Sequence, residues 1–170
     1  MINMKIRFTL LFLIAFSGYA FSQSKIEVGK KVPEITMSKV DGSSFSLSSL
    51  QGKLVLIDFW ATWCAPCVEE QPELKKLYET YSHQVKNNRF EILGVSLDKN
   101  KESWQKAIER FGINWIQISD LKFWKSPVAK TYEVDELPFN VIIDGQGTIL
   151  AKNLHGKELE EFLKKNLSQN

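Results

Sequence analysis

The sequence predicts a single α/β domain with a central sheet, and three observations lead to this. Residues 54–60 form a nearly continuous apolar run, which is typical of a strand buried on both faces of a parallel sheet. A helical pattern follows, and the same order of strand and helix returns over residues 90–111, which favours parallel crossovers. The chain has 170 residues and no internal repeat or linker-like stretch, so one domain accounts for it.

The first elements surround the buried strand. Two short extended segments flank Asp41-Gly42, which predicts a β-hairpin, and a single helical turn is predicted to end at Gly52. After the strand, apolar residues at helical spacing predict a helix over residues 64–82. Pro72 lies inside this helix and should kink its axis, because proline removes one backbone hydrogen bond.

The second half of the domain continues the alternation. A strand over residues 90–97 is followed by an amphipathic helix with Asn100 as its N-cap and Gly112 as its stop. The remaining predicted elements are a strand at 115–118, a helix at 128–132, a hairpin of 139–143 with 148–151, and a C-terminal helix around residues 159–163.

The first 22 residues have the pattern of a secretory signal peptide. Basic Lys5 and Arg7 precede an apolar block at residues 8–16, and small residues lead to Ser22. The alternative is a membrane anchor, but the block is far shorter than the roughly 20 residues that span a bilayer. We therefore expect cleavage near Ser22, no stable membrane insertion afterwards, and a mature domain of residues 23–170 in the periplasm or another extracytoplasmic compartment.

The charge balance argues against nucleic acid as a partner. Without its first 22 residues the chain has 20 basic and 20 acidic residues, so it is formally neutral. Nucleic-acid binding needs a basic surface that this composition does not indicate. We expect a monomer.

The two cysteines, Cys64 and Cys67, predict a redox centre that opens and closes in place. Cys64 falls at the start of the predicted helix, where the helix dipole should lower its pKa below the free value of about 8.5. Cys64 is then the attacking sulfur, and Cys67, one turn further in, resolves the mixed disulfide. The pair needs no other cofactor.

Two other uses of the cysteines are less favoured. A zinc site would need two more ligands, and the only histidines, His83 and His155, stand isolated in polar surroundings, so we expect no metal. A permanent structural disulfide is also disfavoured, because so small a loop gains little entropy from closure.

Two acids are candidates for the base that deprotonates Cys67. Asp58 interrupts the apolar strand six residues before Cys64, where a carboxylate is costly unless it is partnered or neutral. Glu70 lies three residues after Cys67 on the adjacent helix face. Both stay open as proton acceptors.

The segment from Trp63 to Cys67 resembles the active-site motif of the thioredoxin superfamily. Together with the approach over residues 52–60, Glu70 and Pro72, it is similar to the TlpA/ResA-like redoxins of bacterial envelopes, over nearly all of the mature chain. The resemblance implies a thioredoxin-like fold of the redoxin or AhpC/TSA type: a mixed central sheet flanked by helices, with an N-terminal β-hairpin extension.

The resemblance also implies a substrate-binding loop. Residues 132–138 resemble the segment that carries the family's cis-proline, which implies a cis bond between Leu137 and Pro138. In the family this loop faces the cysteine pair and binds the substrate chain. Leu137, Pro138, Pro66 and Trp63 are therefore the expected substrate-binding residues.

Two departures from the family pattern concern this site. Phe139 stands where a threonine often follows the proline, which predicts a more apolar rim. Asp58 matches the buried acid of thioredoxin itself, whereas envelope redoxins often have asparagine there.

The leading functional hypothesis is an exported thiol-disulfide oxidoreductase. Its expected partners are disulfide-bearing envelope proteins and a membrane-linked thiol electron donor. Ala65 and Pro66 place no cation beside Cys64, so we expect a reductant.

Two other function classes are weaker. In peroxiredoxins a proline and a threonine or serine precede the reactive cysteine, where this chain has Ile57 and Ala61. Related copper carriers separate their cysteines by three residues and add a distal histidine, and neither feature is seen.

The five tryptophans have different expected places. Trp60 should lie in the core and Trp63 at the partner surface, and Trp104, Trp115 and Trp124 should be packing residues.

Overall fold

The computed structural model describes residues 26–167, which form a seven-stranded sheet in the order β2-β1-β5-β4-β3-β6-β7. The predicted signal peptide lies outside the described residues. The strands are β1 (Thr36–Lys39), β2 (Ser44–Ser46), β3 (Leu54–Trp60), β4 (Phe90–Ser96), β5 (Ile116–Ser119), β6 (Phe139–Ile143) and β7 (Ile149–Lys152). The helices are η1 (Leu47–Leu50), α1 (Ala65–Thr80), α2 (Ser82–Lys86), α3 (Lys101–Phe111), η2 (Phe123–Lys125), α4 (Pro127–Thr131) and α5 (Gly156–Leu167).

The sheet is mixed, as predicted. Its three central strands, β3, β4 and β5, run parallel, and the strands on either side of them pair antiparallel. All seven residues of β4 and six of the seven in β3 are buried, which explains why these strands read as apolar runs. The N-terminal hairpin of β1 and β2 joins the sheet through β5.

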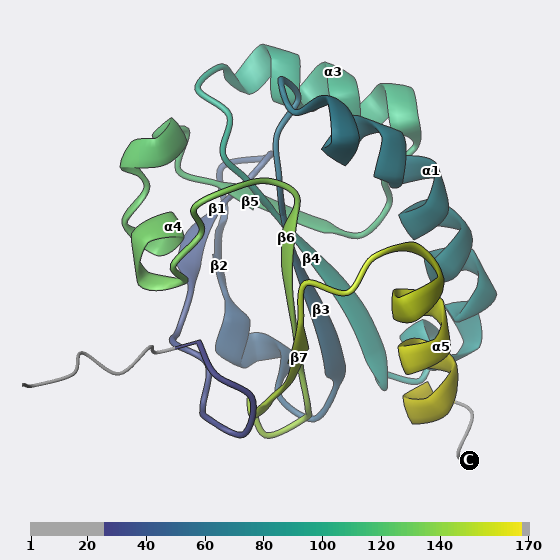
Figure 1. Ribbon diagram of the computed structural model, residues 1–170. Helices are drawn as coiled ribbons and strands as arrows, with labels where there is room; N and C mark the ends of the chain where they lie inside the picture. Colours follow the sequence, from purple (N-terminus) through teal and green to yellow (C-terminus); the bar gives the residue numbers. More distant parts are fainter. Residues whose placement is uncertain (1–25, 168–170) are drawn as a thin grey trace, which may run out of the picture.

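The two faces of the sheet carry different helices (Figure 1). On one face, buried residues of α1, α3 and α5, such as Leu74, Trp104 and Leu159, form one apolar cluster with the sheet. On the other face, η1 and α4 contribute Leu47 and Ala129 to a second cluster. Helices α1 and α5 contact each other, and they lie side by side in the view of Figure 1.

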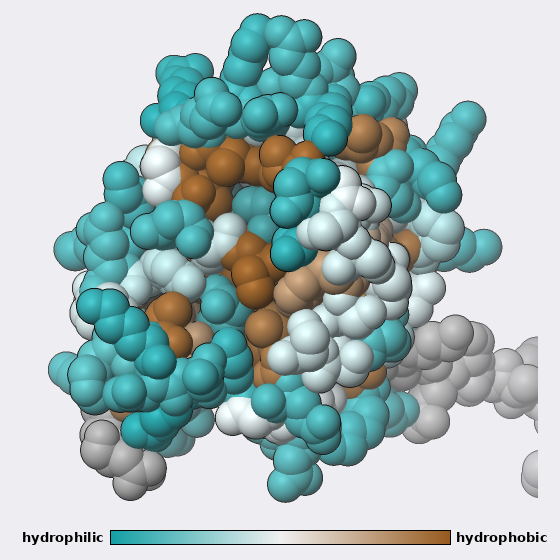
Figure 2. Space-filling view, turned by 180° about the vertical axis from the view of Figure 1, so that it is seen from behind, coloured by the Kyte–Doolittle hydropathy of each residue, from teal (hydrophilic) through white to brown (hydrophobic). Residues whose placement is uncertain are grey.

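Seen from behind, the surface is mostly hydrophilic (Figure 2). Apolar side chains gather on this face below the top of the view, where α3 lies. A shallow hollow between α3 and the start of β5 is lined by Ile108, Trp115 and Ile116. Within residues 26–167, no helix combines the length and the apolar character that crossing a membrane requires.

One row of residues crosses the sheet beneath α1. Asn140, Asp58, Gly94 and Gln117 are successive register partners on β6, β3, β4 and β5. A Cβ atom at Gly94 would lie 2.1 Å from Nε2 of Gln117, so the glutamine side chain fills the space that glycine leaves. Its Oε1 accepts a hydrogen bond from Nε1 of Trp60 at 2.9 Å, and Trp60 is a core residue as predicted.

Local signals located most helix ends correctly. The Asn100 side chain caps α3 by accepting from the Ser103 N–H at 2.9 Å, and Gly112 ends the helix with a φ of 61°. Helix α1 runs through Pro72 from Ala65 to Thr80. One packing prediction is wrong: Trp124 is 40% exposed, because η2 presents it outward, whereas Trp104 and Trp115 are buried.

Candidate active site

The two cysteines lie at the N-terminus of α1, directly beyond the end of β3, and form a disulfide with an S–S distance of 2.08 Å. Cys64 is the N-cap residue, and its sulfur accepts a hydrogen bond from the Cys67 N–H at 3.2 Å. The Cys67 N–H and the N-terminus of α1 therefore both lie against the Cys64 sulfur. Both residues are buried, and Cys64, at 6% exposed, is more accessible than Cys67, at 1%.

Asp58 is buried beneath α1. The alternation along β3 places its side chain on the same face as Leu56 and Trp60, the face that α1 covers, and the residue is 3% exposed. Burial, together with the nearby charge of Glu70, raises the pKa of Asp58 to about 7. A carboxyl group with this pKa can take up and release a proton near neutral pH.

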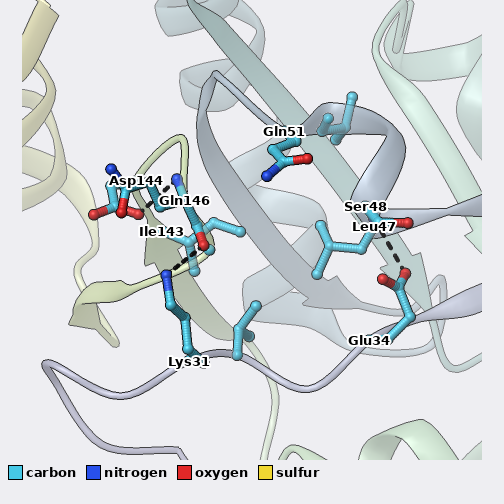
Figure 3. Close-up of a pocket in the computed structure, with 11 residues that line it drawn as sticks. Lys31, Glu34, Leu47, Ser48, Gln51, Ile143, Asp144 and Gln146 are labelled. Atoms are coloured by element: carbon cyan, nitrogen blue, oxygen red, sulfur yellow. Dashed lines mark hydrogen bonds between the residues drawn. The ribbon is translucent and has the colours of Figure 1, made fainter.

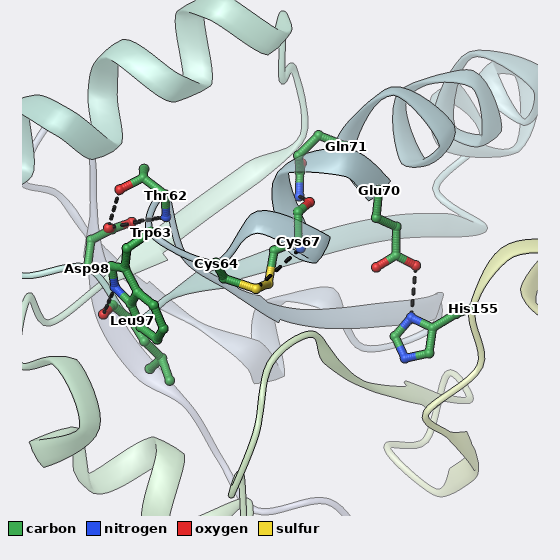
Figure 4. The surroundings of a disulfide bond; sticks show 9 residues. All are labelled: Thr62, Trp63, Cys64, Cys67, Glu70, Gln71, Leu97, Asp98 and His155. Carbon is green, nitrogen blue, oxygen red and sulfur yellow. Dashed lines mark hydrogen bonds and ion pairs between the residues drawn. A yellow bond between two sulfur atoms is a disulfide. The ribbon is translucent and has the colours of Figure 1, made fainter.

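Glu70 on α1 pairs with His155, which directly precedes α5 (Figure 4). Oε1 of Glu70 lies 2.9 Å from Nδ1 of His155, and the two side chains are 12% and 36% exposed. The hydrogen bond to Glu70 is the largest cause of a raised pKa at His155, and the charges of Glu70 and Asp58 add to it. The expectation that His155 is isolated is therefore wrong. No group of three or more potential metal ligands occurs in the described part of the chain.

Asn140 holds the segment that carries His155. Its Nδ2 donates to the Leu154 carbonyl at 2.7 Å, and its Oδ1 accepts from the Leu154 N–H at 3.2 Å. The Asn153 N–H donates to the Asn140 carbonyl at 2.8 Å. Because Asn140 is also the register partner of Asp58, one strand position connects the buried acid with the histidine segment.

The loop before β6 has the cis bond between Leu137 and Pro138 that the resemblance implied. An open groove lies against it, lined by Pro66, Pro138, Glu70 and His155 together with Glu69, Glu73 and Gly156. The structure thus brings two of the expected substrate-binding residues together with Glu70. Phe139 is half-buried, with its ring centroid 5.9 Å from that of Phe59.

Aromatic side chains lie on the opposite side of the disulfide. Trp63 is 45% exposed, and its ring centroid is 4.9 Å from that of Phe123 and 5.8 Å from that of Trp124. Its Nε1 donates to the Leu97 carbonyl at 3.4 Å. We call Trp63, Phe123 and Trp124 the aromatic surface.

A buried acid supports the turn that carries Trp63. Oδ1 of Asp98, a residue that is 2% exposed, accepts from the Thr62 hydroxyl at 2.6 Å, and its Oδ2 accepts from the Ser96 hydroxyl at 2.8 Å. The Thr62 backbone N–H also donates to this carboxylate, at 3.2 Å. Figure 4 shows Asp98 with Thr62, and Trp63 with Leu97, on one side of the disulfide, and Glu70 with His155 on the other.

Sequence reasoning missed four of these residues: His155, Asn140, Asp98 and Phe123. His155 and Glu70 are 85 residues apart in the sequence, so no local spacing connects them. Asp98 lies two residues after the end of buried strand β4, and an acid so close to the end of an apolar run was a usable signal.

A second hollow lies at the far end of β3 from the cysteines (Figure 3). Its polar groups are engaged with one another: Nζ of Lys31 donates to the Gln146 carbonyl at 2.7 Å, and the Ser48 N–H donates to Oε1 of Glu34 at 3.2 Å. Neither a cysteine nor a histidine is among the residues that line this hollow.

Comparison with known proteins points to the same chemistry. The model of the AhpC/TSA family matches residues 28–152. Thiol-disulfide oxidoreductase ResA of Bacillus thuringiensis subsp. konkukian is 33% identical over 161 residues, which cover 88% of this chain and 84% of that protein. ResA of Geobacillus thermodenitrificans is 32% identical over 164 residues, with coverages of 93% and 90%.

Solved structures show the same fold. A thiol-disulfide oxidoreductase from Bacteroides fragilis superposes with a TM-score of 0.74 at 35% identity, over 80% of this chain and 98% of that one. The thioredoxin domain of a thiol-disulfide oxidoreductase from Bacteroides vulgatus gives 0.76 at 34% identity, over 84% and 99%.

Proposed function

The chain belongs to the AhpC/TSA family and is a thiol-disulfide oxidoreductase, and from this premise we propose that it reduces disulfide bonds of exported proteins. One observation carries the proposal: the Cys64–Cys67 pair lies at a helix N-terminus, and the Cys64 sulfur accepts a hydrogen bond from a backbone N–H. Such a site stabilises the thiolate that begins thiol-disulfide exchange.

The proposed reaction has two exchange steps. The Cys64 thiolate attacks one sulfur of a substrate disulfide, forms a mixed disulfide, and releases the other substrate sulfur as a thiolate. Cys67 then loses its proton and attacks the Cys64 sulfur, which frees the second substrate thiolate. Two electrons pass to the substrate, and the chain is left with the Cys64–Cys67 disulfide.

Asp58 and Glu70 handle the Cys67 proton in this proposal. Cys67 is buried, so its thiol needs an acceptor inside the protein. Asp58, with a pKa raised to about 7 by burial, is the inner acceptor. Glu70 and His155 are progressively more exposed and form a route from it to solvent along the groove beside Pro138.

Two parts of the proposal, that the chain reduces its substrates and that it is exported, rest on the sequence. Neither Ala65 nor Pro66 adds a cation or an imidazole next to Cys64, the kind of feature that makes strong oxidants. Residues 1–22 have the pattern of a signal peptide, which supports export. A membrane-linked thiol donor would return electrons to the disulfide, and we propose that the chain works as a monomer.

Mixed-disulfide trapping tests the proposal. The full chain with Cys67→Ser should hold substrate proteins covalently on Cys64, and Cys64→Ser is the matched control that should hold none. Exported disulfide proteins among the captured partners support the proposed substrate class. A reduction potential near that of strong periplasmic oxidants, about −120 mV, would overturn the reducing direction.

A further inference from the structure

The aromatic surface concentrates exposed apolar area beside the reactive cysteine. Among the described residues, the large hydrophobic side chains with high exposure are Val28, Trp63 and Trp124, and two of these three belong to this surface. The centroids of Phe123 and Trp124 are 6.1 Å apart, and both rings contact Trp63. Exposed apolar groups gathered in this way mark interaction sites more often than single exposed residues do.

The backbone that presents these rings is strained. Leu121 and Phe123 both have a φ of 56°, a left-handed conformation that is unfavourable for a bulky residue. Local hydrogen bonds hold the segment: the Leu121 N–H donates to the Ser119 hydroxyl at 3.1 Å, and the Ser126 N–H donates to the Phe123 carbonyl at 3.0 Å. The fold therefore maintains an unfavourable backbone that keeps Phe123 and Trp124 against Trp63.

The charge beside the aromatic surface is positive. Nζ of Lys99 lies 4.3 Å from the centroid of the Phe123 ring, and Lys122 and Lys125 are exposed on the same segment. Two carboxylates lie nearby, and the three lysines outnumber them: Asp98 is buried and hydrogen-bonded to Thr62, and Asp120 accepts from the Lys122 N–H at 3.0 Å.

The groove on the other side of the disulfide has the opposite charge. It is lined by Glu69, Glu70 and Glu73, with His155 as its titratable base. A chain segment that crosses the disulfide therefore meets aromatic rings and lysines at one end and carboxylates at the other.

We propose that the aromatic surface and Lys99 bind the segment of the substrate protein that flanks its reactive cysteine, selecting an aromatic or large apolar side chain and a neighbouring carboxylate. This inference rests on the proposed function and adds the substrate's local chemistry to it. The rings bury the apolar side chain, and the ammonium group of Lys99 pairs with the carboxylate.

Two synthetic peptides test the inference with the full chain in its reduced form. Each has one internal disulfide; in the first, phenylalanine and glutamate flank the attacked cysteine, and in the second, serine and lysine. The wild-type chain should reduce the first peptide about tenfold faster, measured as the ratio of the two kcat/KM values. Because the ratio compares two peptides on the same protein, a variant's overall loss of activity does not affect it.

Two substitutions separate the parts of the surface. Trp124→Ala should lower the ratio, because the apolar contact is reduced, and Lys99→Glu should reverse the charge preference towards a lysine-flanked peptide. Lys165→Glu makes the same charge change at an exposed position on α5, and Val28→Ala truncates an exposed apolar side chain on the N-terminal segment; both should leave the ratio at its wild-type value.

The results that would contradict the docking inference differ from the results that would contradict the proposed function. If the wild-type chain exchanges with a small aromatic disulfide but reduces both peptides equally, or if Lys99→Glu leaves the ratio unchanged, the docking inference is wrong. If the wild-type chain exchanges with neither the peptides nor the small disulfide, the proposed function itself fails.

Discussion

The two sides of the Cys64–Cys67 disulfide are built from different kinds of residue. On one side, Trp63 and Trp124 of the aromatic surface are exposed, and buried Asp98 accepts hydrogen bonds from hydroxyl and backbone N–H groups. On the other side, carboxyl and imidazole groups lead from buried Asp58 through Glu70 to the partly exposed His155. Groups that can contact a partner and groups that can exchange protons are thus separated by the disulfide.

This difference predicts two classes of variant. Substitutions on the Asp58 side should change the pH dependence of exchange with every disulfide, small or large, because the Cys67 proton is released in each turnover. Substitutions on the aromatic side should change which protein is reduced and leave the pH dependence as it is. The following predictions test this separation.

The largest effect is expected for Asp58→Asn. An asparagine cannot accept the Cys67 proton, so the attack of Cys67 on a mixed disulfide should slow by about 100-fold at pH 7. Stopped-flow measurement of thiol release from Cys64 labelled with a small mixed disulfide reports this step directly. A rate within a few-fold of wild type would exclude Asp58 as the acceptor and leave Glu70.

The same residue should make stability depend on pH. The folded oxidised protein retains the Asp58 proton up to a pKa of about 7, whereas the unfolded chain loses it near 3.8. The unfolded state therefore binds fewer protons within this window, and stability falls as pH rises, by at most about 1.4 kcal/mol per pH unit. The raised pKa of His155 acts in the same direction above 6.5.

Urea unfolding at pH 5 and at pH 7.5 measures this slope. In Asp58→Asn, most of the dependence of the unfolding free energy on pH should disappear, and the variant should be more stable than wild type at the higher pH. An unchanged slope in the variant would show that Asp58 titrates similarly in both states.

Glu70→Gln should have a smaller effect on the exchange rate. Removing the Glu70 charge lowers the pKa of Asp58, because that charge helps to raise it. The weaker base should slow Cys67 attack by about tenfold and move the inflection of the pH–rate profile to lower pH. An inflection that moves to higher pH would contradict the assignment.

His155→Gln should move the same inflection in the opposite direction. The protonated imidazole lowers the pKa of Asp58, so its removal raises that pKa, while glutamine can still donate a hydrogen bond to Glu70. We expect a loss of about threefold at pH 7 that is recovered at higher pH. His83→Gln is the matched control, since His83 lies on α2 and contacts Asn87, the residue that follows this helix.

The smallest effect on exchange is expected for Asp98→Asn, the same substitution on the other side. The amide keeps one acceptor oxygen but loses the charge that Thr62 and Ser96 bind, so the free energy of unfolding should fall by about 1 kcal/mol. The pH–rate profile with a small disulfide should keep the wild-type inflection. A shifted inflection would show that the two sides are coupled.

Signals confined to neighbouring residues predicted much of the fold. The apolar run of β3, the N-cap Asn100 and the stop at Gly112 each act within one or two turns of chain, so their effects are visible in the sequence. The cis bond before Pro138 was instead predicted from the resemblance to a family, because nothing in the neighbouring sequence requires it.

Site residues that lie close together in the sequence could be predicted. Residues that only folding brings together could not. Cys64, Cys67 and Glu70 lie within two helical turns, and Asp58 was noticeable because it breaks an apolar strand. His155 lies far from Glu70 in the sequence, and it meets Glu70 on a segment that Asn140 binds just before α5. Trp124 was expected in the packing because a sequence does not show that η2 turns it outward.

The absent side chain at Gly94 has a consequence for how relatives of this chain can vary. The amide of Gln117 occupies the space where a Cβ at position 94 would lie, and it also anchors Trp60 below the redox centre. A residue larger than glycine at position 94 therefore needs a shorter residue at position 117. The two positions should change together during evolution, and a library that randomises both should yield folded pairs that neither single substitution reaches.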